Sequence, residues 1–163
     1  MSYGQFPNRE LAAYAGFICR SIDRIVVCLN GLDEGQLNWR PPGPQTNSLY
    51  LLAIHTMANA EENILGTLCG QPIERRRGDE FAVWGTAAAD AEARWRDLRE
   101  RLTAALGTLD PTELEREREH PRRGSLTGRE VLLVVARHAA EHQGHAELTR
   151  DLLRATLSGK SRG

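Results

Sequence analysis

The stretch 47–69 constrains the fold more than any other part of the chain. Its composition predicts a helix, with Asn47 as N-cap and Gly70 just beyond its end. The apolar residues of this helix lie nearly all round its circumference: Leu49, Leu51, Leu52, Ile54, Met57, Ile64, Leu65 and Leu68. A helix that is apolar on every side has to be surrounded by other elements. We therefore expect it inside a helical bundle. Because one neighbour in a small bundle cannot cover such a helix entirely, we predict a homodimer in which a partner chain covers the rest.

Three further segments carry the apolar spacing of bundle helices. Residues 9–30 repeat apolar side chains four and three apart, and residues 87–106 show a similar pattern. Residues 127–157 begin at a capping box formed by Thr127 and Glu130. Together with the first segment they predict an all-α four-helix bundle.

The connections after the first and third predicted helices are long. Residues 33–46 contain three prolines in four positions, which favours an extended chain, and residues 107–126 are mostly polar. Long connections permit crossovers, so a simple up-down-up-down order does not follow from the sequence. We predict one domain, 1–157, followed by a flexible tail, 158–163.

Two other segments are polar and irregular. In residues 71–85 the arginine triplet 75–77 could meet an anionic ligand, although an exposed, solvated triplet is the commoner case. Phe81 and Trp84 are the residues expected to pin this segment to the bundle. Charges alternate in sign from residue 115, which indicates an exposed hairpin that closes at 123–124.

Composition excludes several classes of function. The net charge of -1 gives no concentrated basic face, so we expect no nucleic-acid partner. No long apolar span or signal peptide is visible, so we expect no membrane partner and a cytoplasmic location. Cys19, Cys28 and Cys69 form no motif and are odd in number, which indicates reduced, buried thiols.

Three of the five histidines lie within eight residues of the last predicted helix. At about 100° per residue His138, His142 and His145 share one stripe, and Glu141 lies on its flank. Residues four apart on a helix can place two imidazoles on one cation. The alternative is a solvated polar face. The interpretation that the histidine stripe faces the interior rests on apolar neighbours that continue it: Leu133, Ala136 and Ala140.

A third ligand is available in the apolar helix. His55 lies in the middle of the stretch 47–69 and is one of its few polar side chains. A lone core histidine is usually structural, and that alternative remains open. A buried imidazole nevertheless needs a hydrogen bond or a metal, and facing helices of a bundle commonly build metal sites.

The chain resembles the DinB/YfiT-like superfamily, in particular its small bacterial DinB-like domains. The resemblance covers about residues 9–155. It rests on a set of motifs in a characteristic order: Leu37-Asn38-Trp39-Arg40-Pro41, then Asn47-Ser48-Leu49 leading to His55, and finally His138-x-x-x-His142-x-Gly144-His145-Ala146-Glu147 with Arg150.

The resemblance implies a four-helix bundle of unusual chain order, frequently dimeric, with three histidines that hold a divalent metal such as zinc or nickel. Carried over, the metal ligands are His55, His138 and His142. Family members of known activity are thiol S-transferases that use bacillithiol or a similar low-molecular-weight thiol, and a mycothiol-dependent maleylpyruvate isomerase. In the branch with the Gly-His-Ala pattern the position of His138 is often Glu, and here His restores the three-histidine set.

Three neutral imidazoles leave a divalent cation with open positions, as in catalytic sites. Such a position could hold a thiol of lowered pKa, which would attack a small electrophile, or a water for hydrolysis. Glu141 or His145 would then accept the proton, and these are the predicted catalytic residues. The main alternative is a non-catalytic metal- or ligand-binding stress-response module in which the metal only staples the bundle. The sequence contains no recognisable motif for an organic cofactor.

Overall fold

Helix α1 (Arg9–Val27) begins at Asn8, whose side-chain oxygen accepts a hydrogen bond from the backbone N–H of Leu11 at 2.8 Å. The computed structural model describes residues 5–160, so residues 1–4 and 161–163 lie outside the described part. The apolar seam predicted for this helix is buried against the other helices: Leu11, Ala15, Ile18, Ile22 and Ile25 are all at most 1% exposed.

The apolar stretch forms α3 (Leu49–Ala60), which continues as a π-helical segment, η2 (Glu61–Leu68). The N-cap is Ser48 and not the predicted Asn47, because the Ser48 hydroxyl accepts from the Leu51 N–H at 3.2 Å. Every residue of α3 is buried within the single chain. The expectation that a partner chain is needed to cover this helix is therefore wrong.

The two remaining long helices are α5 (Ala88–Gly107) and α6 (Gly128–Lys160). The predicted capping box precedes α6, where the Thr127 N–H donates to Glu130 at 2.7 Å and the Glu130 N–H donates to the Thr127 hydroxyl at 3.2 Å. Helix α6 continues three residues past its predicted end at 157. The predicted tail therefore begins inside this helix, and its last three residues fall outside the described part.

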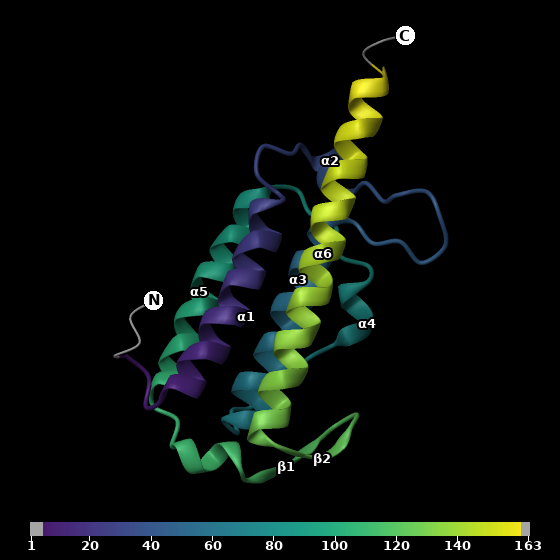
Figure 1. The fold of residues 1–163 in the computed structure, drawn as a ribbon. Helices are drawn as coiled ribbons and strands as arrows, with labels where there is room; N and C mark the ends of the chain where they lie inside the picture. The colour runs from purple at the N-terminus through teal and green to yellow at the C-terminus, as the bar shows by residue number, and fades with distance from the viewer. Residues whose placement is uncertain (1–4, 161–163) are drawn as a thin grey trace.

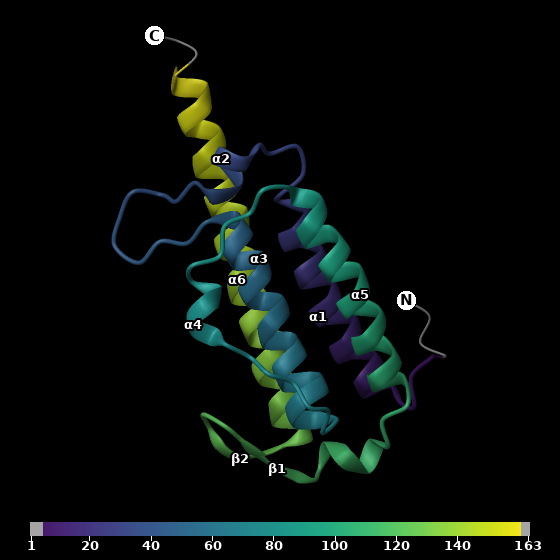
Figure 2. The same ribbon diagram turned by 180° about the vertical axis from the view of Figure 1, so that it is seen from behind.

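The four long helices form the bundle of an all-α fold, as predicted (Figure 1). Helices α1 and α6 run in one direction, and α3 and α5 run in the other (Figures 1 and 2). Because α3 and α5 are consecutive and parallel, the connection 69–87 has to return along the whole length of the bundle. The connection 69–87 therefore makes the crossover. The two connections that were predicted to be long, 33–46 and 107–126, do not.

Short elements occupy the connections. A five-residue helix, α2 (Glu34–Asn38), precedes the prolines of the connection between α1 and α3. Helix α4 (Arg77–Glu80) lies in the connection between η2 and α5. The connection between α5 and α6 contains a 3-10 turn, η3 (Pro111–Leu114), and a hairpin of β1 (Glu117–His120) and β2 (Gly124–Thr127). The strands are antiparallel, with Glu117 opposite Thr127 and His120 opposite Gly124. Gly124 has φ +75°, which explains why the predicted hairpin closes there.

The aromatic residues of connection 69–87 do not anchor it by burial. Phe81 is 45% and Trp84 62% exposed, although the Trp84 indole N–H donates to Glu34 at 2.7 Å. Instead Arg75, expected to be solvated, has a side chain only 4% exposed, and Glu80 is 8% exposed. A buried ion pair therefore fixes this connection. Within residues 5–160, no helix combines the length and the apolar character needed to cross a membrane.

Candidate metal centre

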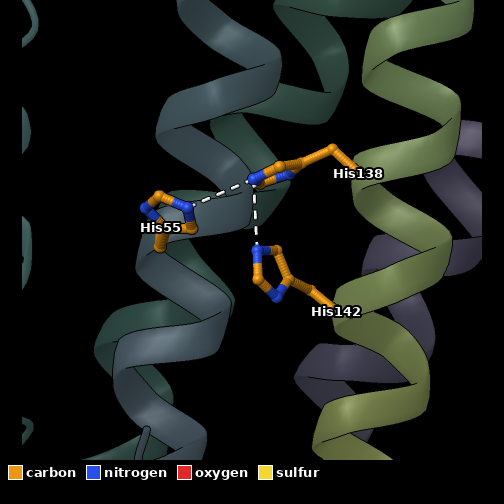
Figure 3. A group of neighbouring side chains, drawn as sticks. All are labelled: His55, His138 and His142. Atoms are coloured by element: carbon orange, nitrogen blue, oxygen red, sulfur yellow. Dashed lines mark hydrogen bonds between the residues drawn. The ribbon is translucent and has the colours of Figure 1, made fainter. Parts of the chain in front are cut away.

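Helix α3 carries His55 at its middle, where the imidazole is 6% exposed and faces α6. Helix α6 carries His138 and His142 one turn apart, and both are half-buried. Figure 3 shows the three rings pointing toward one another across the two helices. The Nε2 atom of His138 lies 3.1 Å from the Nε2 atom of His55 and 3.1 Å from that of His142. One ligand atom from each ring lies within 4.8 Å of the others.

Hydrogen bonds alone do not satisfy this arrangement. A neutral imidazole nitrogen either donates or accepts, so the Nε2 atom of His138 cannot donate to His55 while it accepts from His142. A cation placed among the three nitrogens would satisfy all of them. Ligand nitrogens of a tetrahedral Zn²⁺ lie about 3.3 Å apart, given Zn–N bonds of about 2.0–2.1 Å, which is close to the observed 3.1 Å. The residues therefore fit a divalent metal ion.

The histidines are held in the neutral form that metal binding requires. Burial, together with repulsion from the neighbouring imidazoles, lowers the pKa of His138 to about 3 and that of His142 to about 4. Burial also lowers the pKa of His55, although the carboxylate of Glu80 opposes the shift. At neutral pH each ring therefore has a lone pair available for a metal.

Glu80, in the connection 69–87, orients the His55 ring. Its Oε2 atom lies 2.7 Å from the Nδ1 atom of His55, so the Nδ1–H donates to the carboxylate and Nε2 is left free as a ligand. Burial raises the pKa of Glu80, but hydrogen bonds from Arg75 and His55 outweigh it, and the net pKa is lowered. The carboxylate is therefore charged at neutral pH. By contrast, the buried Nδ1 atoms of His138 and His142 have no hydrogen-bond partner among the described residues.

Arg75 connects this carboxylate to a second one. Its Nε donates to Glu80 at 2.6 Å, and its Nη1 donates to Glu62, on η2, at 2.9 Å. Glu62 also accepts from Arg122 in the hairpin. The network thus ties η2, connection 69–87 and the hairpin together behind His55. Neither Glu80 nor Glu62 was predicted as part of the site, because nothing in the local spacing of a polar segment marks which charged residue turns inward.

The two predicted catalytic residues lie on the outer side of α6. Both Glu141 and His145 are exposed. The His145 ring lies 5.6 Å from that of His142, and it lines a cavity of about 330 Å³ beside the proline-rich connection. The Glu141 carboxylate lies 3.7 Å from Arg137 and makes no hydrogen bond to the histidine cluster among the described residues. Leu133, expected on the inward stripe, is 57% exposed.

Comparison with known proteins identifies the family of the chain. A search of curated proteins finds no similar sequence. The family model of the DinB superfamily matches residues 20–146, which include His55 and all three histidines of the stripe on α6. That match covers well over half of the chain. The chain therefore belongs to the DinB superfamily.

Proposed function

We propose that this protein binds one divalent metal ion, zinc or nickel, through His55, His138 and His142. The observation that carries the proposal is the convergence of three Nε2 atoms, two of them 3.1 Å from the third, on neutral rings. Imidazole nitrogen suits both metals. The cluster contains three potential protein ligands among the described residues, so a tetrahedral ion would keep a fourth position for an exogenous ligand.

Metal analysis of single variants tests the ligand set. His55→Ala, His138→Ala and His142→Ala should each reduce the metal content well below one ion per chain. His145→Ala is the matched control, because this ring is exposed and outside the cluster, and it should retain the metal. Full occupancy in all three ligand variants would refute the assignment.

The proposed reaction is the transfer of a low-molecular-weight thiol to a small electrophile. A divalent metal bound there would lower the pKa of a coordinated thiol, so that thiolate forms near neutral pH. The protein's own cysteines are poor nucleophiles, because burial raises the pKa of each of them. His145 is better placed than Glu141 to accept the thiol proton, since its ring neighbours His142, whereas the Glu141 carboxylate faces Arg137.

A thiol-transfer assay tests the reaction. A variant in which Cys19, Cys28 and Cys69 are all replaced by Ala, loaded with metal and given an external thiol, should retain turnover. The same variant with His138→Ala should lose it. If the cysteine-free protein folds and holds metal but has no activity, a protein cysteine is the nucleophile and the proposed reaction is wrong.

The non-catalytic alternative also has an observation in its favour. The three imidazoles come from two different helices, so a bound ion would cross-link α3 to α6 and stabilise the bundle. Under this alternative, metal removal would lower the thermal midpoint, and no thiol or electrophile would be turned over at any metal loading. Under the proposed reaction, turnover would rise in proportion to metal content.

A further inference from the structure

A second feature of the molecule adjoins the histidine cluster. His55 and His138 form one wall of a cavity of about 280 Å³, and arginines from two connections form most of the rest. Helix α4 and the hairpin lie on the same side of the α3/α6 pair, which brings these connections together (Figure 2). The arginines that line the cavity are Arg75, Arg77, Arg122 and Arg123.

Two of these arginines are already neutralised. Arg75 pairs with Glu62 and Glu80, and Arg122 donates to Glu62. Two carboxylates therefore offset two guanidinium groups. Arg77 and Arg123 form no ion pair with any described carboxylate, and the Arg77 guanidinium lies over the Phe81 ring, 5.7 Å from its centroid. The cavity therefore retains an excess of two positive charges.

The hairpin turn that presents Arg123 is held rigidly. His120 is 4% exposed, and its Nδ1 accepts a hydrogen bond from the backbone N–H of Arg122 at 3.0 Å. Its other nitrogen, Nε2, must then carry the proton, and it donates to the Asn63 side-chain oxygen at 2.9 Å. The turn closes with the Arg123 N–H donating to the His120 carbonyl at 3.2 Å. The backbone that carries Arg122 and Arg123 is thus held by a buried, hydrogen-bonded histidine, and the turn is preorganised.

A residue in the wall of the same cavity carries a buried polar atom without a partner. Asn59 lines the cavity and is 8% exposed, yet its Oδ1 atom is buried and accepts no hydrogen bond from a described residue. Buried polar atoms are rarely left without a partner, because an unmet hydrogen bond destabilises the folded state. A small rotation of the Asn59 side chain would present this oxygen to a hydrogen-bond donor of a ligand in the cavity.

We propose that this cavity binds the anionic group of a small molecule, a carboxylate or a phosphate, whose hydrogen-bond donor reaches Asn59. The planar guanidinium groups of Arg77 and Arg123 match either oxyanion. The volume suits a small metabolite and not a macromolecule. That the anion belongs to the thiol or electrophile of the reaction rests on the function proposed above, since His55 and His138 share the cavity. Binding of the anion itself does not depend on that function.

Calorimetric titration with succinate and with inorganic phosphate, in a chloride background, tests the site. The test variant is Arg77→Gln/Arg123→Gln. The control, Arg96→Gln/Arg154→Gln, removes the same charge from exposed positions outside the cavity. The wild type and the control should bind at least one anion, and the test variant should bind it roughly ten-fold or more weakly, since hydrogen bonds to charged groups contribute about 1.5–3 kcal/mol. Succinate binding alone identifies a carboxylate ligand, and phosphate binding alone identifies a phosphate ligand.

Equal loss in the test and control variants would show a nonspecific charge effect and would overturn the proposal, as would the absence of binding to either anion. A second variant, Asn59→Asp, serves if the first variant fails to fold. It places a carboxylate in the cavity and should weaken anion binding.

Metal content measured on the same samples separates the two proposals. Arginine-dependent binding by a protein that takes up no metal would refute only the metal function, and a metal-loaded protein that binds no anion would refute only this site.

Discussion

The Oε2 atom of Glu80 lies 2.7 Å from the Nδ1 atom of His55, so a residue of the crossover connection fixes the tautomer of a histidine on the central helix. The two residues are 25 positions apart in sequence, and both are buried. A carboxylate that accepts from the second nitrogen of a metal-ligating imidazole holds the ring in place and increases its basicity. Glu80 is therefore a positioning residue for the proposed metal site.

Replacing this carboxylate should weaken metal binding without abolishing it. Glu80→Gln removes the charge that favours the Nδ1–H tautomer, and partners of this kind typically contribute about 10–100-fold to metal affinity. Competition with a chromophoric chelator would measure the change. Glu74→Gln, an exposed substitution in the same connection, is the matched control and should leave the affinity unchanged. Equal affinities for both variants would show that Glu80 has no role in positioning His55.

The buried guanidinium of Arg75 should be among the most costly side chains to remove. Arg75→Met leaves Glu62 and Glu80 at the interior, with side chains only 12% and 9% exposed and one fewer cationic partner each. Breaking a buried ion pair in this way typically costs about 3–5 kcal/mol. Urea unfolding of the metal-free protein would measure it, with the exposed Arg76→Met as control. A loss below about 1 kcal/mol would mean that the charge of Arg122 and the hydrogen bond from His55 suffice to stabilise the two carboxylates.

The sequence predicted the helices and the histidine cluster because both follow from local periodicity. His138 and His142 are four apart on one helix, and His55 stood out as a polar residue in an apolar stretch. The direction of α5 was not predictable, because it depends on where a polar connection lies in space. Arg75 and Glu80 were missed for a related reason: nothing in a run of charged residues marks the pair that becomes buried. The π-helical hydrogen bonds of η2 likewise leave no recognisable signal in the sequence.

Gly85 should tolerate no side chain. A Cβ atom added there would lie 2.2 Å from the Tyr50 ring, and the Gly85 backbone is held on both sides by the Asn38 side chain, at 2.7 and 2.9 Å. Gly85→Ala should therefore lower the free energy of unfolding by about 1–3 kcal/mol or more. Gly78→Ala is the control, since its added Cβ would meet nothing within 4 Å, and it should be neutral or slightly stabilising. Equal thermal midpoints would contradict the close packing of Gly85 on Tyr50.

The homodimer remains a prediction, but the residues expected to form its interface are different. Helix α3 is covered within one chain, but Phe17 on α1 and Leu133 on α6 are 43% and 57% exposed. These two helices lie side by side at one face of the bundle (Figure 1). Light scattering should give about twice the chain mass of 18.2 kDa. The double variant Phe17→Glu/Leu133→Glu should give the monomer mass, whereas Leu157→Glu, at the far end of α6, should not. A monomeric wild type at micromolar concentration would refute the prediction.

The last prediction concerns the thiol of Cys19 and its dependence on pH. Burial raises the pKa of this thiol from 9.0 to about 11, so the folded state holds it neutral while the unfolded chain begins to ionise near pH 9. Because the pKa of this thiol is higher in the folded state than in the unfolded chain, the protonated thiol contributes fully to the stability of the fold below pH 9. That contribution is lost as the pH rises toward 11. The loss is on the order of 2–3 kcal/mol. Cys19→Ala should therefore show a smaller decline in the free energy of unfolding above pH 9 than the wild type.

In the folded wild type at pH 8, iodoacetamide should modify the half-buried Cys69 before Cys19, which is 2% exposed. Rapid alkylation of Cys19 at that pH, or parallel stability curves for the two proteins, would show that the thiol is accessible and would reopen the question of a protein nucleophile.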